Sequence, residues 1–145
     1  MYRQRNLIRT ITLMVGMVVV LAGTVLAQNA PPIPPSLVVL ATDELKALLD
    51  RKERFLLVDA RNQQEYQEGH IPKALHVYDE AMEAHKTQFP SDLSHPLVFY
   101  CNGYPKCVRS LQGAKMALMW GYTQVYLYAA GFPAWEKRGY PVERE

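Results

Sequence analysis

Uninterrupted runs of apolar residues recur along the chain and predict buried strands. The runs at 55–58 and 96–100 show no alternation with polar residues, which is expected of strands covered on both faces. Shorter apolar runs at 37–40, 75–77 and 125–128 predict three more strands.

Segments with helical spacing or helix-starting residues lie between these runs. We expect a first helix that is capped by Thr42 or Asp43 and carries Leu45, Leu48 and Leu49 on one face. Further helices or helical turns are expected over 62–68, over 79–88, from the loop 102–106 to about Trp120, and around Trp135. Because strands alternate with helices, the sequence predicts an α/β fold with a mostly parallel sheet and helices on both faces.

The first 27 residues have the layout of a secretory signal. Three arginines within the first nine positions precede an apolar run at 11–26, and Ala27 ends a small-residue site at which we expect cleavage. The alternative is an uncleaved membrane anchor over residues 10–26, although about 20 apolar residues are needed to span a bilayer comfortably. In both cases the domain lies outside the cytoplasm. A cleaved protein is periplasmic or exported, and an uncleaved one is anchored to the outer face of the inner membrane.

Composition and charge indicate that the chain after residue 27 consists of a linker and one globular domain. Four prolines within residues 28–35 predict an extended linker, so we place the domain at 36–145. Removal of the first 27 residues takes away three arginines and no acidic residue, so the net charge changes from +2 to −1. The basic character therefore belongs to the N-terminus, and we expect no nucleic-acid partner.

Cys101 is the strongest candidate for chemistry because it directly follows the apolar run at 96–100. Ligands of parallel sheets bind beyond the carboxyl ends of the strands. Backbone N–H groups of the next loop and the start of the following helix both favour a thiolate there. The expected anion-binding residues of this loop are Asn102, Gly103, Tyr104, Pro105, Lys106 and Arg109. An inert core cysteine is the alternative.

The chain contains two cysteines, Cys101 and Cys107, six positions apart. If the loop curls around Cys101, their Cα atoms come within the limit of about 7 Å for a disulfide. Such bonds persist outside the cytoplasm. We interpret Cys107 as a resolving or disulfide partner of Cys101, and a permanent disulfide that silences the site is the alternative.

Three separate segments resemble the signatures of rhodanese-like domains, in the family's order. They comprise Val58-Asp59-Ala60-Arg61 with Glu65-Tyr66 and Gly69-His70-Ile71-Pro72-Lys73-Ala74, then Val98-Phe99-Tyr100-Cys101 with Arg109-Ser110 and Gly113-Ala114, and finally Ala130-Gly131-Phe132-Pro133-Ala134-Trp135 with Gly139-Tyr140-Pro141-Val142. These matches span nearly all of the expected domain.

The resemblance implies a single rhodanese-like domain with a five-stranded parallel sheet. It also implies a sulfurtransferase in which Cys101 accepts sulfane sulfur as a persulfide from a small sulfur-containing anion or persulfide donor and passes it to a thiol acceptor. Residues of the first signature are then expected to support the structure, namely Asp59, Arg61, Glu65 and His70. No cofactor is required, and the histidines show no metal-ligand spacing, so we expect no metal.

The loop departs from the family pattern in length. Arg109 follows Cys101 by eight positions, whereas the basic residue of ordinary rhodaneses follows by five. Related phosphatases need an arginine where this chain has Cys107, which argues against phosphatase activity. The sequence leaves three functions open: an exported sulfurtransferase, a redox-active dithiol protein that uses Cys101 and Cys107, and a non-catalytic rhodanese-like binding module.

Overall fold

The computed structural model describes residues 30–145, so the expected signal or anchor segment lies outside the described residues. In chain order the elements are β1 (Val38–Val39), α1 (Thr42–Asp50), β2 (Leu56–Asp59), α2 (Gln63–Glu68), β3 (Leu75–His76), the 3-10 helices η1 (Asp79–Ala81) and η2 (Lys86–Gln88), β4 (Leu97–Tyr100), α3 (Arg109–Met119), β5 (Val125–Tyr128) and α4 (Gly131–Lys137). All five strands lie within or at the edges of the predicted apolar runs.

The five strands form one sheet in the order β1-β5-β4-β2-β3. The four pairings between neighbouring strands are all parallel, which confirms the predicted α/β fold and sharpens "mostly parallel" to all-parallel. β4 lies at the centre, between β5 and β2, and Tyr100 at its end aligns with Asp59 on one side and Tyr128 on the other. The carboxyl ends of three strands therefore meet at one edge of the sheet.

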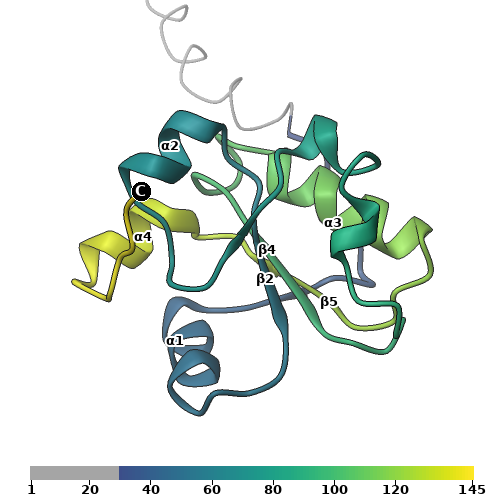
Figure 1. Cartoon of the computed structure of the whole chain (residues 1–145), viewed down its shortest axis with the longest axis horizontal. Coiled ribbons are helices and arrows are strands. Elements are labelled where there is room, and N and C mark those ends of the chain that lie inside the picture. Colours follow the sequence, from purple (N-terminus) through teal and green to yellow (C-terminus); the bar gives the residue numbers. More distant parts are fainter. Residues whose placement is uncertain (1–29) are drawn as a thin grey trace, which may run out of the picture.

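Alternate side chains of β4 enter two separate hydrophobic cores. Leu97 and Phe99 pack with Leu111 of α3 on one face of the sheet. Val98 and Tyr100 point to the other face, where the core includes Leu45 of α1, Tyr66 of α2 and Trp135 of α4. Figure 1 shows α3 on one side of the sheet and α1, α2 and α4 on the other, as expected from the doubly apolar strands.

Polar residues at the first helical turns fix where two of the helices begin. Asn62 Oδ1 accepts a hydrogen bond from the Glu65 N–H at 2.9 Å, and the Glu65 carboxylate accepts one from the Asn62 N–H at 3.0 Å. This reciprocal capping box starts α2 where it was predicted. The prediction for α1 was wrong by one or two positions, because Ala41 is the N-cap and the Glu44 carboxylate binds its N–H at 2.7 Å.

The expected helix over 79–88 does not form as one element. The structure has two short 3-10 turns there, at Asp79–Ala81 and Lys86–Gln88. Met82 is the one large apolar side chain of this segment, and it is fully buried. A single anchor gives no continuous apolar stripe, so little burial offsets the cost of ordering a longer helix.

Part of the proline-rich segment contacts the domain. Ile33 packs against the core beside α3, and the Pro31 carbonyl accepts a hydrogen bond from Tyr104 Oη at 3.2 Å. Between residues 30 and 145, no helix has the length and apolar character needed to cross a membrane.

Candidate functional site

Cys101 lies immediately beyond β4, at the edge where the carboxyl ends of the central strands meet. Its side chain is fully buried, and its carbonyl accepts a hydrogen bond from the Phe132 N–H of α4 at 2.8 Å. The closing segment of the domain thus holds the backbone at Cys101. This is the strand-end position that the sequence predicted for the thiol.

The loop after Cys101 is held against the turn that follows β5. The Tyr104 N–H donates to the Ala129 carbonyl at 2.8 Å, and the Cys107 N–H donates to the Gly103 carbonyl at 2.9 Å. A Cβ atom on Gly131 would collide with the Gly103 nitrogen and the Cys101 carbonyl oxygen, so only glycine permits this close approach. The loop therefore curls back toward Cys101, as the sequence suggested.

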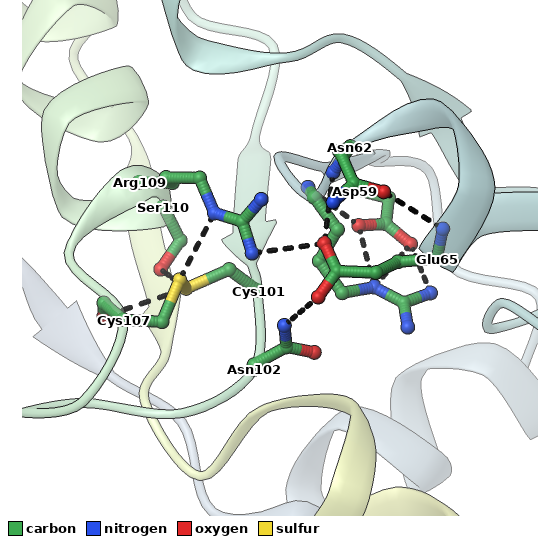
Figure 2. The surroundings of a disulfide bond; sticks show 9 residues. Asp59, Asn62, Glu65, Cys101, Asn102, Cys107, Arg109 and Ser110 are labelled. Atoms are coloured by element: carbon green, nitrogen blue, oxygen red, sulfur yellow. Dashed lines mark hydrogen bonds and ion pairs between the residues drawn. A yellow bond between two sulfur atoms is a disulfide. The ribbon is translucent and has the colours of Figure 1, made fainter.

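A disulfide joins Cys101 to Cys107, whose Cα atoms are 6.4 Å apart. Figure 2 shows the bond beside Ser110 and Arg109, at one side of a polar cluster that continues to Asn102 and Glu65. Cys101 has no solvent-exposed surface, whereas Cys107 is 8% exposed. Cys107 lies two positions before α3, which begins at Arg109.

The buried Cys101 sulfur has two polar neighbours besides its disulfide partner. Ser110 Oγ lies 3.1 Å from Cys101 Sγ, and the Cys107 carbonyl oxygen lies at 3.4 Å. Ser110 was not among the predicted site residues. Its place beside Arg109 in the second signature was the one signal that could have found it.

Arg109 reaches the disulfide from the first position of α3. Its Nε donates to Cys107 Sγ at 3.3 Å, and its Nη2 donates to Glu65 Oε2 at 3.0 Å. Glu65 Oε1 also accepts a hydrogen bond from the Asn102 amide. Glu65 was predicted to support the structure, and its contacts place this support at the loop that follows Cys101.

The surroundings of Glu65 favour its charged form. Partial burial alone would raise its pKa, but hydrogen bonds from the Asn62 N–H, Asn102 and Arg109 outweigh this, and the pKa is lowered. A carboxylate thus faces the Arg109 guanidinium throughout the neutral range, and it fixes that side chain beside the Cys107 sulfur.

Two of the predicted loop residues lie at the surface. Pro105 and Lys106 are exposed, and across residues 30–145 Lys106 forms no ion pair. Tyr104 is partly buried and extends toward Pro31. The loop therefore presents one cation, Arg109, directly to the cysteine pair and leaves Lys106 at its surface.

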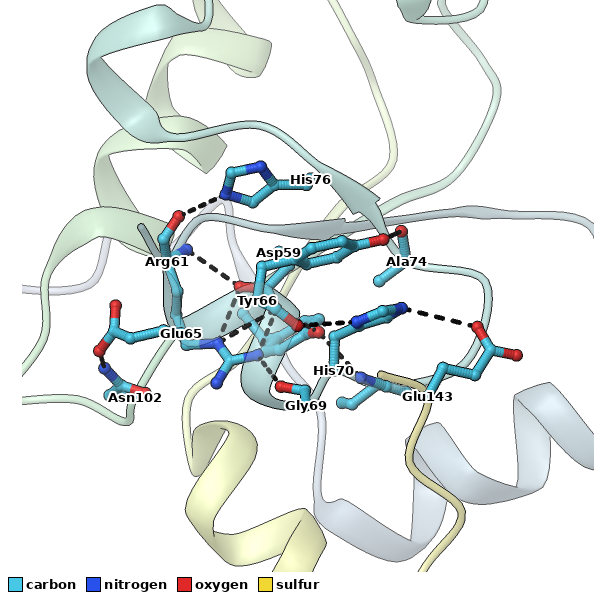
Figure 3. Close-up of polar contacts among 12 residues, drawn as sticks. Asp59, Arg61, Glu65, Tyr66, Gly69, His70, Ala74, His76, Asn102 and Glu143 are labelled. Carbon is cyan, nitrogen blue, oxygen red and sulfur yellow. Dashed lines mark hydrogen bonds and ion pairs between the residues drawn. The ribbon is translucent and has the colours of Figure 1, made fainter. Parts of the chain in front are cut away.

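The remaining first-signature residues form a buried network behind the site, shown in Figure 3. Arg61 is 3% exposed and Asp59 is fully buried, with Arg61 Nη2 2.6 Å from Asp59 Oδ2 and 2.6 Å from the Gly69 carbonyl. Tyr100 Oη donates to Asp59 at 2.6 Å and accepts from the Ile71 N–H at 3.1 Å. Burial, followed by the Asp59 charge, raises the pKa of Tyr100, so the phenol stays protonated as a donor.

His70 fixes the loop that precedes Pro72. Its Nδ1 bonds the Tyr66 carbonyl at 2.9 Å, its ring stacks on Tyr66 at 3.8 Å, and its backbone pairs with Glu143 near the C-terminus. Asp59, Arg61 and His70 thus hold the segment from β2 to Pro72 together, and none of their hydrogen bonds involves the disulfide. Among the described residues, no group of three or more His, Cys, Asp or Glu side chains could hold a metal ion.

Comparison with known proteins agrees with this arrangement. A family model described as the rhodanese-like domain matches residues 41–138. A thiosulfate sulfurtransferase from Pseudomonas aeruginosa is 27% identical with a TM-score of 0.65, over 74% of this chain and 20% of that one. A protein of unknown function from Rhodopseudomonas palustris, described as a possible tyrosine phosphatase, is 28% identical with a TM-score of 0.63, over 74% of this chain and 86% of that one.

A rhodanese-related protein from Thermoplasma volcanium shares the fold at lower sequence identity. It is 18% identical with a TM-score of 0.61, over 74% of this chain and 99% of that one. The matched region contains both cysteines and the whole first signature.

Proposed function

The chain belongs to the rhodanese-like domain family, and from this premise we propose that it is a sulfurtransferase that carries sulfane sulfur as a persulfide on Cys101. The position of Cys101 supports the proposal most strongly. It follows the central strand within the family region, and the chain closes around it from α4 and from the loop. Similarity to a thiosulfate sulfurtransferase adds to this support.

The reaction begins from the reduced pair. The Cys101 thiolate attacks the outer sulfur of thiosulfate or of a polysulfide, the S–S bond of the donor breaks, and its electron pair leaves with sulfite or with the shortened polysulfide. A thiol acceptor then attacks the outer sulfur of the persulfide, and Cys101 departs as the thiolate. No net oxidation occurs, so no cofactor is needed.

The proposed site of action is outside the cytoplasm. The arginines, the apolar run and Ala27 support an exported protein cleaved after Ala27, or a protein anchored by residues 10–26. A compartment without a strong thiol reductant also suits a Cys101–Cys107 disulfide. We place the domain at 36–145, with 28–35 as the linker.

Intact mass spectrometry tests the proposal. Reduced protein incubated with thiosulfate or polysulfide is expected to gain the mass of one sulfur atom, and Cys101→Ser is expected to gain none, because an alcohol is a far poorer nucleophile at neutral pH. Gain of sulfur by Cys101→Ser, or no gain by the reduced wild type, would contradict the proposal.

A second candidate function is a redox-active dithiol protein, and the disulfide is the observation that favours it. In that case mild oxidant would remove two hydrogens from the reduced protein, and donors would add no sulfur. Phosphatase activity is not proposed, because position 107 carries the disulfide cysteine where those enzymes need an arginine.

A further inference from the structure

The Cys107 sulfur occupies the place that an outer persulfide sulfur would take. In a persulfide, the Cys101 sulfur is bonded to one further sulfur atom, and in this structure it is bonded to Cys107 Sγ. The Cys101 sulfur can form only one S–S bond, so the persulfide and the disulfide exclude each other. A persulfide can form on the oxidised protein only if Cys107 leaves.

The leaving sulfur has a cation beside it. Arg109 Nε donates to Cys107 Sγ at 3.3 Å, whereas the neighbours of Cys101 Sγ are a carbonyl oxygen and the Ser110 hydroxyl. A guanidinium stabilises a thiolate, and a carbonyl oxygen favours a protonated thiol. Opening of the bond is therefore easier when the electron pair goes to Cys107.

Glu65 keeps Arg109 in this position. Its carboxylate binds Arg109 Nη2 at 3.0 Å and also binds the Asn102 amide, so both ends of the loop are tied to α2. The Glu65 and Arg109 side chains are 28% and 21% exposed, so the cation is partly shielded from water. Glu65 is thus a positioning residue for Arg109.

Burial limits which nucleophile can reach the Cys101 sulfur. Cys101 has no exposed surface, and its sulfur lies beneath the loop and the start of α3. Any nucleophile must displace the loop to reach this sulfur, and a bulky thiol needs a larger displacement than a small one. Hydrosulfide consists of one sulfur atom and carries the negative charge that Arg109 attracts.

We propose that the disulfide is itself a substrate-binding form of the site, which captures hydrosulfide on Cys101 while Arg109 receives the departing Cys107 thiolate. This inference rests on the proposed persulfide chemistry at Cys101. Hydrosulfide attacks Cys101 Sγ, the S–S bond to Cys107 breaks, and its electron pair goes to Cys107. Sulfur from hydrosulfide is oxidised to the sulfane level, the disulfide is reduced, and the hydrosulfide proton passes to water or to Cys107.

Peptide mapping of the full chain tests this inference. Oxidised protein is mixed with an equimolar amount of sodium sulfide, quenched early with iodoacetamide and digested with trypsin, which cleaves after Lys106 and separates the two cysteines. The additional sulfur is expected on the peptide 87–106, and plain alkylation is expected on the peptide 107–109. Additional sulfur on 107–109, or no additional sulfur on 87–106, would overturn the inference.

Variants of Arg109 test its role at the leaving sulfur. Arg109→Gln is expected to slow sulfide capture about tenfold, as loss of a hydrogen bond to a charged group implies. Arg109→Lys is expected to restore most of the rate. Lys106→Gln is the matched control, because it removes the same charge from an exposed side chain. Capture by the variants is followed by intact mass, since this change removes the tryptic site between the cysteines.

In about 1 M salt, where distant charges are screened, Lys106→Gln is expected to capture sulfide within about twofold of the wild type. Equal rates for Arg109→Gln and the wild type would overturn the assigned role of Arg109. Loading of the reduced protein by polysulfide is a separate measurement. If that loading occurs while the oxidised protein ignores hydrosulfide, the inference fails and the proposed sulfurtransferase function stands.

Discussion

At the scale of single residues, the two cysteines differ in their burial and in their polar neighbours. Cys101 is enclosed by the strand end, Ser110 and the turn after Cys107, and Cys107 lies closer to the surface beside Arg109. The sequence was sufficient to place Cys101 at the strand end and Cys107 within bonding reach. It could not assign Arg109 to Cys107, because that contact depends on how the first turn of α3 meets the loop.

Cys107→Ser is expected to load one sulfur atom from polysulfide and to hold it longer than the wild type. A serine hydroxyl cannot displace the outer sulfur from Cys101 to close a disulfide. The measurement is sulfur content by intact mass over time, with Cys101→Ser as the matched control. Retained loading in Cys101→Ser together with lost loading in Cys107→Ser would reverse the assignment of the two thiols.

Lys106→Ala and Arg109→Ala are expected to slow anionic donors more than uncharged organic polysulfides. Both changes remove positive charge, but only Arg109 contacts the cysteine pair, so its effect is expected to be the larger. The Lys106 effect should vanish with added salt, since exposed charges are screened over about 8–10 Å. Equal slowing of both donor types would mean that these side chains shape the loop and do not attract substrate.

At the scale of elements, the strands and most helices were predictable because their apolar runs are unambiguous. β2, β4 and β5 are covered on both faces, and their sequences contain no competing pattern. The segment 79–88 was mispredicted because its residues favour helix locally while packing supplies one buried anchor, Met82. The link from α2 to the start of α3 joins Glu65 to Arg109 across 44 positions, and no local pattern encodes such a contact.

Glu65→Gln is expected to make the free energy of unfolding depend less steeply on pH in the acid range. The pKa of Glu65 is lowered by folding, so the unfolded state binds its proton more readily, and the carboxylate stabilises the fold above its unfolded pKa. That contribution disappears as the pH falls through the lower folded pKa. Urea unfolding of the disulfide form between about pH 3 and pH 7 measures the slope.

Glu68→Gln is the matched control for this experiment. Glu68 lies on the exposed side of the same helix and accepts a hydrogen bond from Gln64 at 2.9 Å. It is expected to leave the slope close to that of the wild type. If Glu65→Gln shows the wild-type slope as well, the ionic link between α2 and the loop does not contribute to stability.

At the scale of the whole molecule, the first described residues contact the loop that follows Cys101. The Pro31 carbonyl accepts a hydrogen bond from the Tyr104 hydroxyl, and Ile33 packs on the core beside α3. Exported protein is expected to start at Gln28, which leaves these contacts in the mature chain. N-terminal sequencing of extracytoplasmic protein measures this. Met1 on membrane-bound protein would support the anchor, and Met1 on soluble cytoplasmic protein would contradict export.

A version of the chain that begins at Ser36 is expected to fold as a cooperative α/β domain, because every strand and helix within residues 30–145 lies beyond Pro35. It loses the packing of Ile33 and the partner of Tyr104, so we expect it to be less stable, by about 1–2 kcal/mol, than a version that begins at Ala30. Circular dichroism during urea unfolding compares the two. An unfolded Ser36 version would mean that the proline-rich segment is part of the domain, and equal stability of both would mean that its contacts contribute nothing to the fold.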